Sequence, residues 1–131
     1  MARRLMRTSA LLLALALALA ILRGVPAQAA GPAAPAAPVK GMVTVVDLGA
    51  KTCIPCRMMA PVLTEVERQY KGRAAVVFID VREHGDQATR FRIRAIPTQI
   101  FFDKAGREVS RHEGFMDKNT LAAQLDKLLA K

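Results

Sequence analysis

The only two cysteines of the chain are Cys53 and Cys56, and Ile54 and Pro55 separate them. Two cysteines three residues apart at the start of a helix lie on one face of its first turn, where they can close a small-ring disulfide. That ring cross-links very little chain, so it adds far less to stability than the ~3 kcal/mol of a fifteen-residue loop. A bond that contributes little to folding is suited to being formed and broken, so the pair predicts thiol–disulfide exchange.

The spacing also predicts different parts for the two thiols. At a helix N-terminus, unpaired backbone N–H groups and the positive end of the helix dipole favour a thiolate over a thiol at Cys53. Cys56 lies one turn deeper and is expected to be the resolving thiol. It would attack the mixed disulfide that Cys53 forms with a substrate.

The first 29 residues have the pattern of a secretory signal peptide. Three arginines precede an unbroken apolar run over residues 10–22, and Ala27-Gln28-Ala29 is typical of a cleavage site. The run of 13 residues is short of the ~20 that a spanning helix needs, so an uncleaved membrane anchor is the less favoured alternative. We therefore expect a cleaved signal peptide over residues 1–29 and a periplasmic protein.

The charge of the remaining chain argues against a nucleic-acid partner. Removing residues 1–29 removes four arginines and no acidic residue, which lowers the formal net charge from +9 to +5. Nucleic-acid binding would require a contiguous basic stripe with interleaved aromatic residues. The nearest candidate, the RFRIR stretch with Arg90, Arg92 and Arg94, is interpreted as a solvated face.

The pattern behind the signal peptide predicts one α/β domain. Residues 30–41 are rich in proline and alanine and are interpreted as a linker or disordered arm, followed by a domain over residues 42–131. The expected elements are a buried strand over 42–48, a helix from the cysteine motif to Gly72, strand 74–80, a short helix over 88–93, strand 98–102, strand 108–112 and a final helix capped by Asp117.

This order, β-α-β-α-β-β-α, resembles the thioredoxin fold, an α/β fold in which helices flank a central mixed sheet. The resemblance covers about ninety residues, from Met42 to the C-terminus, and is carried by several matches at the expected relative positions. The matches are Asp47 six residues before the first cysteine, the CIPC motif, Arg57 and Met58 after it, Pro61, Ile96-Pro97-Thr98, Gly106 and Gly114.

The resemblance implies roles for residues outside the cysteine motif. Pro97 would follow a cis peptide bond, and its loop would pack against the disulfide. Substrate would bind there, at Ile96, Pro97, Thr98 and Gly114. Asp47 would be buried behind Cys56, with its pKa raised by desolvation, and would pass protons to and from that thiol; the alternative is a partly solvated residue at the strand end.

Three departures from the family pattern tune the motif. Thr52 stands where a tryptophan usually precedes the first cysteine, and Ile54, followed by Pro55, stands where glycine is usual. The lysine that usually partners the buried aspartate is missing here, because its position corresponds to the apolar stretch near Val76. These changes leave the reaction class intact but argue against cytosolic-style thioredoxin activity and recycling by its usual reductase. The stretch GFMDKNTLAAQL resembles the thioredoxin-like periplasmic domain of a membrane thiol reductase, which favours a reducing role.

The sequence therefore predicts an exported thiol–disulfide oxidoreductase, more a reductant than an oxidant, that needs no cofactor beyond the Cys53–Cys56 disulfide. Its expected partners are exported proteins with disulfides or thiols, together with a membrane thiol reductase as electron donor. A monomer is expected. The alternative is a module that holds Cu(I) with the two thiolates during metalloenzyme assembly. No protein metal site is expected, because His84 and His112 lie in polar segments and a structural zinc site needs four ligands.

Overall fold

The computed structural model describes residues 32–131, so the predicted signal peptide lies outside the described residues. The elements occur in the expected order, β-α-β-α-β-β-α. They are β1 (Val43–Gly49), α2 (Ile54–Tyr70), β2 (Ala74–Asp80), α3 (Gly85–Arg90), β3 (Thr98–Phe102), β4 (Glu108–Glu113) and α4 (Lys118–Leu129). None of the helices within residues 32–131 is long and apolar enough to cross a membrane.

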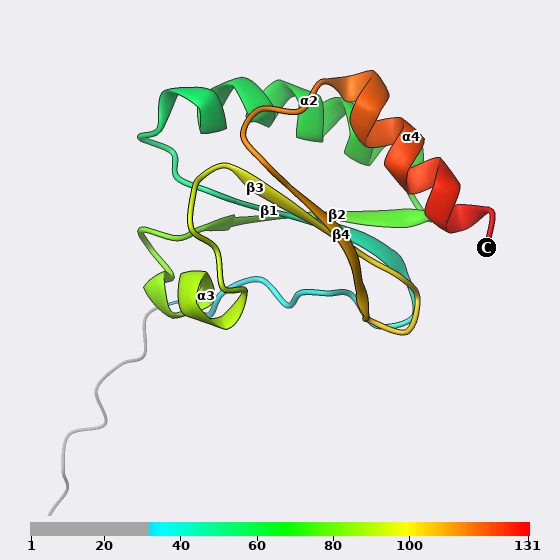
Figure 1. The fold of residues 1–131 in the computed structure, drawn as a ribbon, viewed down its shortest axis with the longest axis horizontal. Coiled ribbons are helices and arrows are strands. Elements are labelled where there is room, and N and C mark those ends of the chain that lie inside the picture. The colour runs from blue at the N-terminus through cyan, green and yellow to red at the C-terminus, as the bar shows by residue number, and fades with distance from the viewer. Residues whose placement is uncertain (1–31) are drawn as a thin grey trace, which may run out of the picture. The chain divides into compact units, whose positions relative to one another are not determined.

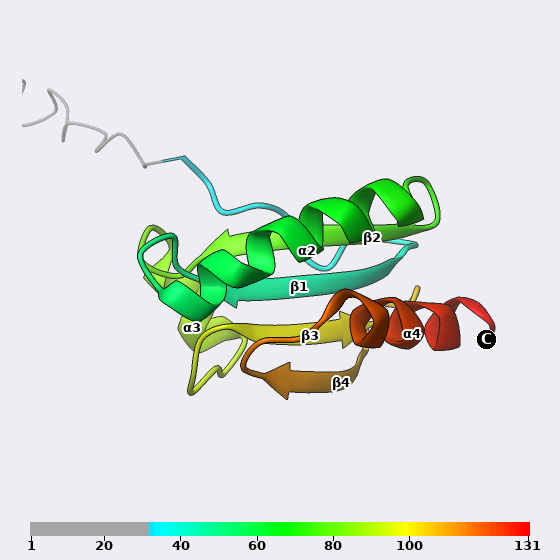
Figure 2. The same cartoon turned by 90° about the horizontal axis from the view of Figure 1, so that it is seen from above.

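The four strands form one mixed sheet in the order β2-β1-β3-β4 (Figure 2). β1 pairs in parallel with β2 and antiparallel with β3, and β3 and β4 form an antiparallel hairpin. All seven residues of β1 are buried, which agrees with its nearly continuous apolar sequence. The cysteine motif follows directly from the end of this central strand.

Helices α2 and α4 cover one face of the sheet, and α3 lies on the opposite face (Figure 1). Because side chains alternate along a strand, Val43 and Val45 pack in the core beneath α2 and α4, whereas Val46 and Leu48 pack on the other side. The same alternation turns the side chain of Asp47 toward α2. The alternation of side chains along β1 therefore places the buried Asp47 next to α2.

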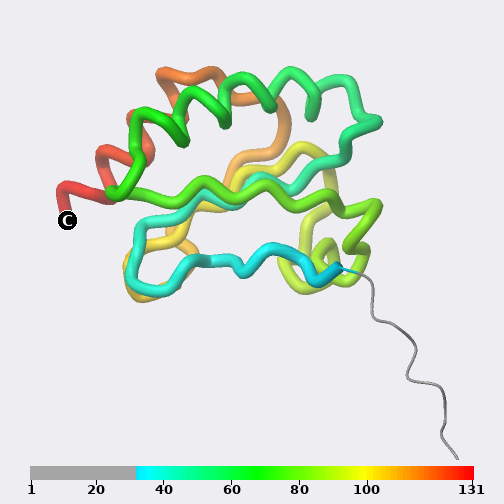
Figure 3. Tube along the Cα trace, turned by 180° about the vertical axis from the view of Figure 1, so that it is seen from behind, coloured from blue at the N-terminus to red at the C-terminus, as the bar shows by residue number. Residues whose placement is uncertain are grey.

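Part of the segment assigned to a linker lies within the compact unit, which spans Ala34–Lys131. The chain before β1 runs along the face of the sheet opposite α2 (Figure 3), where Ala37 is buried. The Arg90 guanidinium donates a 2.7 Å hydrogen bond to the Ala37 carbonyl, and the Val39 N–H donates to the Thr44 hydroxyl at 3.1 Å. Ala37 thereby joins the apolar cluster on this face of the sheet, which includes Val46, Leu48 and Phe102.

The short helix α3 differs from its expected position over residues 88–93. It begins at Gly85, three residues before the predicted start, and ends at Arg90. Phe91 leaves the helix to pack edge-on against Phe102, with 6.1 Å between the ring centroids, and Arg92 adopts a left-handed φ of 50°. The apolar pattern of Phe91 and Ile93 thus reflects packing of the following loop rather than a helix face.

Candidate active site

Cys53 lies at the N-terminus of α2, where it is the N-cap residue. Its backbone N–H bonds to the Ala50 carbonyl at 3.0 Å, and its own carbonyl accepts from the Arg57 N–H at 3.0 Å. Pro55 is tolerated in this first turn because its missing N–H would have no partner within the helix. Both cysteines are free thiols, with Cys53 partly accessible and Cys56 buried. This is the asymmetry expected of an attacking and a resolving thiol.

The loop that leads to Cys53 is held by Asp80, at the end of β2. The Asp80 carboxylate accepts hydrogen bonds from the backbone N–H groups of Lys51 at 3.0 Å and Arg82 at 2.9 Å. Burial raises the pKa of Asp80, but hydrogen bonds from the backbone of Lys51, Arg82 and Glu83 outweigh it, and the net pKa is lowered. Thr52, the residue before the first cysteine, is exposed. Asp80 is not among the predicted site residues, because nothing in the sequence pattern shows that the end of β2 reaches this loop.

Cys56 packs closely against Gly49 at the end of β1, where any larger residue would be crowded. A Cβ on Gly49 would lie 3.2 Å from the Cβ and 3.3 Å from the Sγ of Cys56. A cavity of about 470 Å³ also borders Cys56. Its wall combines apolar side chains with the charged residues Lys51, Arg57 and Glu67; the apolar ones include Leu63, Val76 and Phe78. Burial, followed by a hydrogen bond with Cys53, raises the pKa of the Cys56 thiol to about 11. At neutral pH, Cys56 therefore needs a base before it can act as a nucleophile.

Asp47 is a candidate for that base. Its side chain is fully buried, and the negative charge of its carboxylate contributes to the raised pKa of the Cys56 thiol. Burial raises the pKa of Asp47 to about 6, against a hydrogen bond from Gln99 that lowers it. The predicted burial and raised pKa are both present. The hydrogen bond from Gln99, with 2.7 Å between Nε2 and the Asp47 Oδ1, was missed in the sequence.

The residues expected to bind substrate lie in the loop before β3, at the start of β3 and just after β4. The Ile96–Pro97 peptide bond is cis, as predicted. Pro97 and Thr98 are buried and Ile96 is half-buried. The Thr98 hydroxyl donates to the Ala95 carbonyl at 2.7 Å, and the Gly114 N–H donates to the Pro97 carbonyl at 2.7 Å. Gly114 has a φ of +100°, a conformation that favours glycine, so it joins the end of β4 to this loop without strain.

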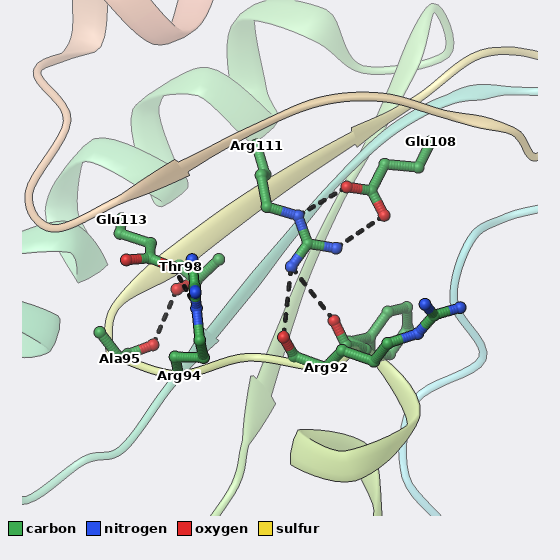
Figure 4. A network of polar contacts seen from close by, with 8 residues as sticks. Arg92, Arg94, Ala95, Thr98, Glu108, Arg111 and Glu113 are labelled. Atoms are coloured by element: carbon green, nitrogen blue, oxygen red, sulfur yellow. Dashed lines mark hydrogen bonds and ion pairs between the residues drawn. The ribbon is translucent and has the colours of Figure 1, made fainter.

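A side-chain network on β4 anchors the chain that enters this loop (Figure 4). Arg111 forms a two-point ion pair with Glu108, at 2.6 and 2.8 Å, and its Nη1 donates to the carbonyls of Phe91 and Arg92 at 3.3 and 3.4 Å. The paired, planar guanidinium therefore holds two successive carbonyls of the incoming chain in place.

Replacing Arg111 with alanine should loosen the loop without changing the thiols. We expect a loss of up to ~10-fold in kcat/KM toward a protein disulfide, because each ~1.4 kcal/mol of lost positioning is tenfold in rate. The rate with a small-molecule disulfide should stay close to that of the unchanged chain. The matched control is Arg107→Ala, because Arg107 lies in the same hairpin but pairs with Asp103 at its turn. Equal losses for the two variants would show that Arg111 has no part in placing the loop.

Exposed apolar side chains lie on the segments that carry the site. Ile54, Met58 and Phe115 are 73, 54 and 43% exposed, and they are three of the four large apolar residues that are exposed among residues 32–131. The segment after Gly114 is tied to α2, because the Met116 N–H donates to the thioether sulfur of Met59 at 3.3 Å. An apolar surface beside a reactive thiol favours a peptide segment over a small polar ligand.

The histidines take no part in this arrangement within the described residues. His112 is exposed, with its Nε2 3.2 Å from the Phe115 carbonyl oxygen. Between residues 32 and 131, no three His, Cys, Asp or Glu side chains are grouped so that they could hold a metal ion.

Comparison with known proteins gives consistent matches. The sequence model of the family "Thioredoxin" matches residues 38–127. Thioredoxin of Staphylococcus aureus is 42% identical over 91 residues, which cover 70% of this chain and 86% of that protein. Among solved structures, chloroplastic thioredoxin z has a TM-score of 0.64 and 32% identity, covering 70% of this chain and 81% of its own. The germline-specific thioredoxin Deadhead of Drosophila melanogaster has a TM-score of 0.61 and 28% identity, covering 67% and 82%. The fold expected from the sequence is thereby confirmed.

Proposed function

Since this chain belongs to the thioredoxin family and is a thiol–disulfide oxidoreductase, we propose that it reduces disulfides of exported proteins through Cys53 and Cys56. The observation that carries the proposal is the placement of the two thiols. Cys53 is accessible at the N-terminus of α2, and Cys56 is buried one turn deeper beside Asp47. The pair that exchanges electrons is thus separated into one thiol that meets the substrate and one that completes the reaction.

In the first step, the Cys53 thiolate attacks one sulfur of a substrate disulfide. A bond forms between Cys53 Sγ and that sulfur, the substrate disulfide breaks, and the other substrate sulfur leaves as a thiolate. In the second step, Cys56 loses its proton and attacks Cys53 Sγ. The Cys53–Cys56 disulfide forms, the mixed disulfide breaks and the second substrate thiolate leaves. The substrate gains two electrons, which the two cysteines supply.

Asp47 is proposed as the base of the second step. Its carboxylate takes the proton of Cys56 as the thiol becomes a nucleophile, and returns it to the departing substrate thiolate or to solvent. With a pKa of about 6, the carboxyl is mostly ionised at neutral pH and can accept a proton without binding it too tightly. The Cys56 thiol, with a pKa of about 11, is almost fully protonated at neutral pH, so its ionisation depends on such a base.

A reducing role is supported by the electrostatics of the dithiol. A strong oxidant of this class has a reduced form that is stabilised relative to its disulfide. Here burial and the charge of Asp47 disfavour the ionised form of Cys56, so the dithiol gains no such stabilisation at that sulfur. The similarity of the C-terminal stretch to the periplasmic domain of a membrane thiol reductase supports the same direction.

Export to the periplasm is proposed from the N-terminal sequence, in which arginines, an apolar run and Ala27-Gln28-Ala29 stand in the order of a signal peptide. In that compartment the substrates would be exported proteins, and reducing equivalents would come from a membrane thiol reductase. The exposed apolar side chains of Ile54, Met58 and Phe115 support an extended protein segment as substrate.

The test is a reduction assay with an oxidised exported protein and the dithiol form of this chain, with substrate thiols and the thiol state of Cys53 and Cys56 measured by mass spectrometry. We expect transfer of two electrons per chain. We also expect a reduction potential close to those of the reducing thiol–disulfide oxidoreductases rather than those of the strong oxidants. Cell fractionation, with N-terminal sequencing of the recovered chain, tests export and cleavage after residue 29. A chain that binds one Cu(I) through both thiols but transfers no electrons would instead favour the metal-assembly alternative.

A further inference from the structure

Gln99 is a buried polar residue to which the sequence analysis assigned no role. It lies on β3 directly opposite Asp47 in the antiparallel register with β1, and its side chain is fully buried. An amide in such a position costs free energy unless it is hydrogen-bonded, whereas an apolar side chain would not. Its one side-chain hydrogen bond, of 2.7 Å, is donated by Nε2 to the Asp47 Oδ1.

The surroundings of Asp47 give it no positively charged partner within residues 32–131. α2 contributes the Cys56 thiol, β2 pairs Phe78 with Asp47 in register, and β3 contributes Gln99. Val76 occupies the position near which the resemblance places a lysine, and it lies in the wall of the cavity beside Cys56. The amide of Gln99 is thus the polar side chain that hydrogen-bonds the buried carboxylate, and it does so from β3, on the side of β1 away from Val76.

We propose that Gln99 is a positioning residue that holds the Asp47 carboxyl group while it exchanges a proton with Cys56, and so sets the pH range in which the resolving step is fast. This inference rests on the proposed function, because it concerns the proton transfer of the second step. It adds a residue on a third element, β3, to the thiols of α2 and the carboxyl group of β1.

The amide can serve both forms of the carboxyl group. When Asp47 is ionised, the Nε2 group of Gln99 donates to it. The Oδ2 of Asp47 and the Oε1 of Gln99 are both buried and have no hydrogen-bond partner among the described residues. When Asp47 takes the proton of Cys56, its new hydroxyl group gains an acceptor in the Oε1 of the same amide. Asp47 can therefore gain and lose the proton without leaving its buried hydroxyl group without a hydrogen-bond acceptor.

The hydrogen bonds of Gln99 to the ionised and to the protonated Asp47 differ in strength, and this difference decides whether Gln99 raises or lowers the pKa of Asp47. A hydrogen bond to an ionised carboxylate is roughly twice as strong as one between neutral groups. Gln99 therefore stabilises the carboxylate more than the acid, and it opposes the burial that raises the pKa of Asp47. Without the amide, the pKa of Asp47 should rise and the carboxyl should be protonated at a pH where it now acts as a base.

The test uses the full chain with Gln99→Met, which keeps the length of the side chain and removes both polar groups. The Asp47 carboxyl carbon is titrated by NMR in the dithiol form, and the rate of the resolving step is measured from pH ~5 to ~9. We expect the pKa of Asp47 to rise by on the order of one pH unit. The acid limb of the rate profile should move upward by the same amount. Gln99→Leu serves as a second variant with the same expectation.

Phe101→Leu is the matched control, because Phe101 lies on the same strand in the core beneath α2 and has no polar contact with Asp47. Phe101→Leu should lower the stability of the fold. It should leave unchanged both the pKa of Asp47 and the pH of the acid limb of the rate profile. An unchanged or lowered pKa of Asp47 in Gln99→Met, or a rate profile that does not follow that pKa, overturns the inference. The NMR titration needs no substrate. A chain that reduces no protein disulfide would therefore refute the proposed function while the titration still reports on Gln99.

Discussion

A Cys56→Ala variant is expected to accumulate covalent complexes with exported proteins that have disulfides. Cys53 is accessible at the N-terminus of α2 and can still attack a substrate disulfide, so the first bond forms. The resolving thiol is missing, so no intramolecular attack releases the substrate from Cys53. We expect substrate-linked species on non-reducing gels that disappear with a reductant, and turnover reduced to the background rate.

The matched variant is Cys53→Ala, in which the buried thiol of Cys56 remains. Its raised pKa and its burial make it a poor nucleophile at neutral pH, so no adducts should form. Adducts in Cys53→Ala and none in Cys56→Ala would reverse the assignment of the two cysteines. Both single variants should fold, because neither side chain forms a cross-link in the dithiol structure.

An Asp47→Asn variant should be more stable than the unchanged chain at neutral pH. The pKa of Asp47 rises from 3.8 to about 6 on folding, because burial removes water from the carboxylate, so the folded chain binds the proton more tightly than the unfolded chain. The stabilisation that this proton binding provides is complete below the unfolded value and is lost as pH rises through the folded value. Two pKa units correspond to ~3 kcal/mol, and the asparagine variant, which does not ionise, would not lose this stability. Denaturant unfolding should show equal stability near pH ~4 and a gap that opens between pH ~4 and ~7.

The same substitution should slow the resolving step. Removing a general base costs on the order of 100-fold in rate. The loss should appear in the conversion of the mixed disulfide to product at neutral pH, whereas formation of the mixed disulfide through Cys53 should change little. The loss should shrink as pH approaches the pKa of Cys56, about 11, because hydroxide then ionises the thiol. A constant stability difference between acidic and neutral pH would refute the buried, raised-pKa carboxyl, and equal rates would refute its role as a base.

The sequence was sufficient for features that depend on local pattern. The continuous apolar run of β1 predicted a strand buried on both faces, and the bounds of β2 and β3 agree with the predicted ranges. Asp117 caps α4 as expected, accepting a hydrogen bond from the Thr120 N–H. The cysteine spacing and the position of the helix start were enough to predict that Cys53 is more accessible than Cys56.

Features that depend on contacts between distant segments could not be predicted. Gln99 meets Asp47 only through the register of β1 with β3, and Asp80 meets the loop before Cys53 only because the ends of β1 and β2 coincide. Gly49 has no signal of its own until Cys56 is packed against it. Likewise, the segment around Ala37 has the composition of a linker, and its packing depends on the apolar residues that the sheet presents on the face opposite α2.

The most direct test of the account is the fate of the two cysteines after a single turnover. The dithiol chain is mixed with an excess of an oxidised protein, the reaction is quenched with a thiol-blocking reagent, and the peptides with Cys53 and Cys56 are analysed by mass spectrometry. We expect an intramolecular Cys53–Cys56 disulfide, with two new thiols on the substrate for each disulfide formed. Two blocked cysteines and an unchanged substrate disulfide would contradict it.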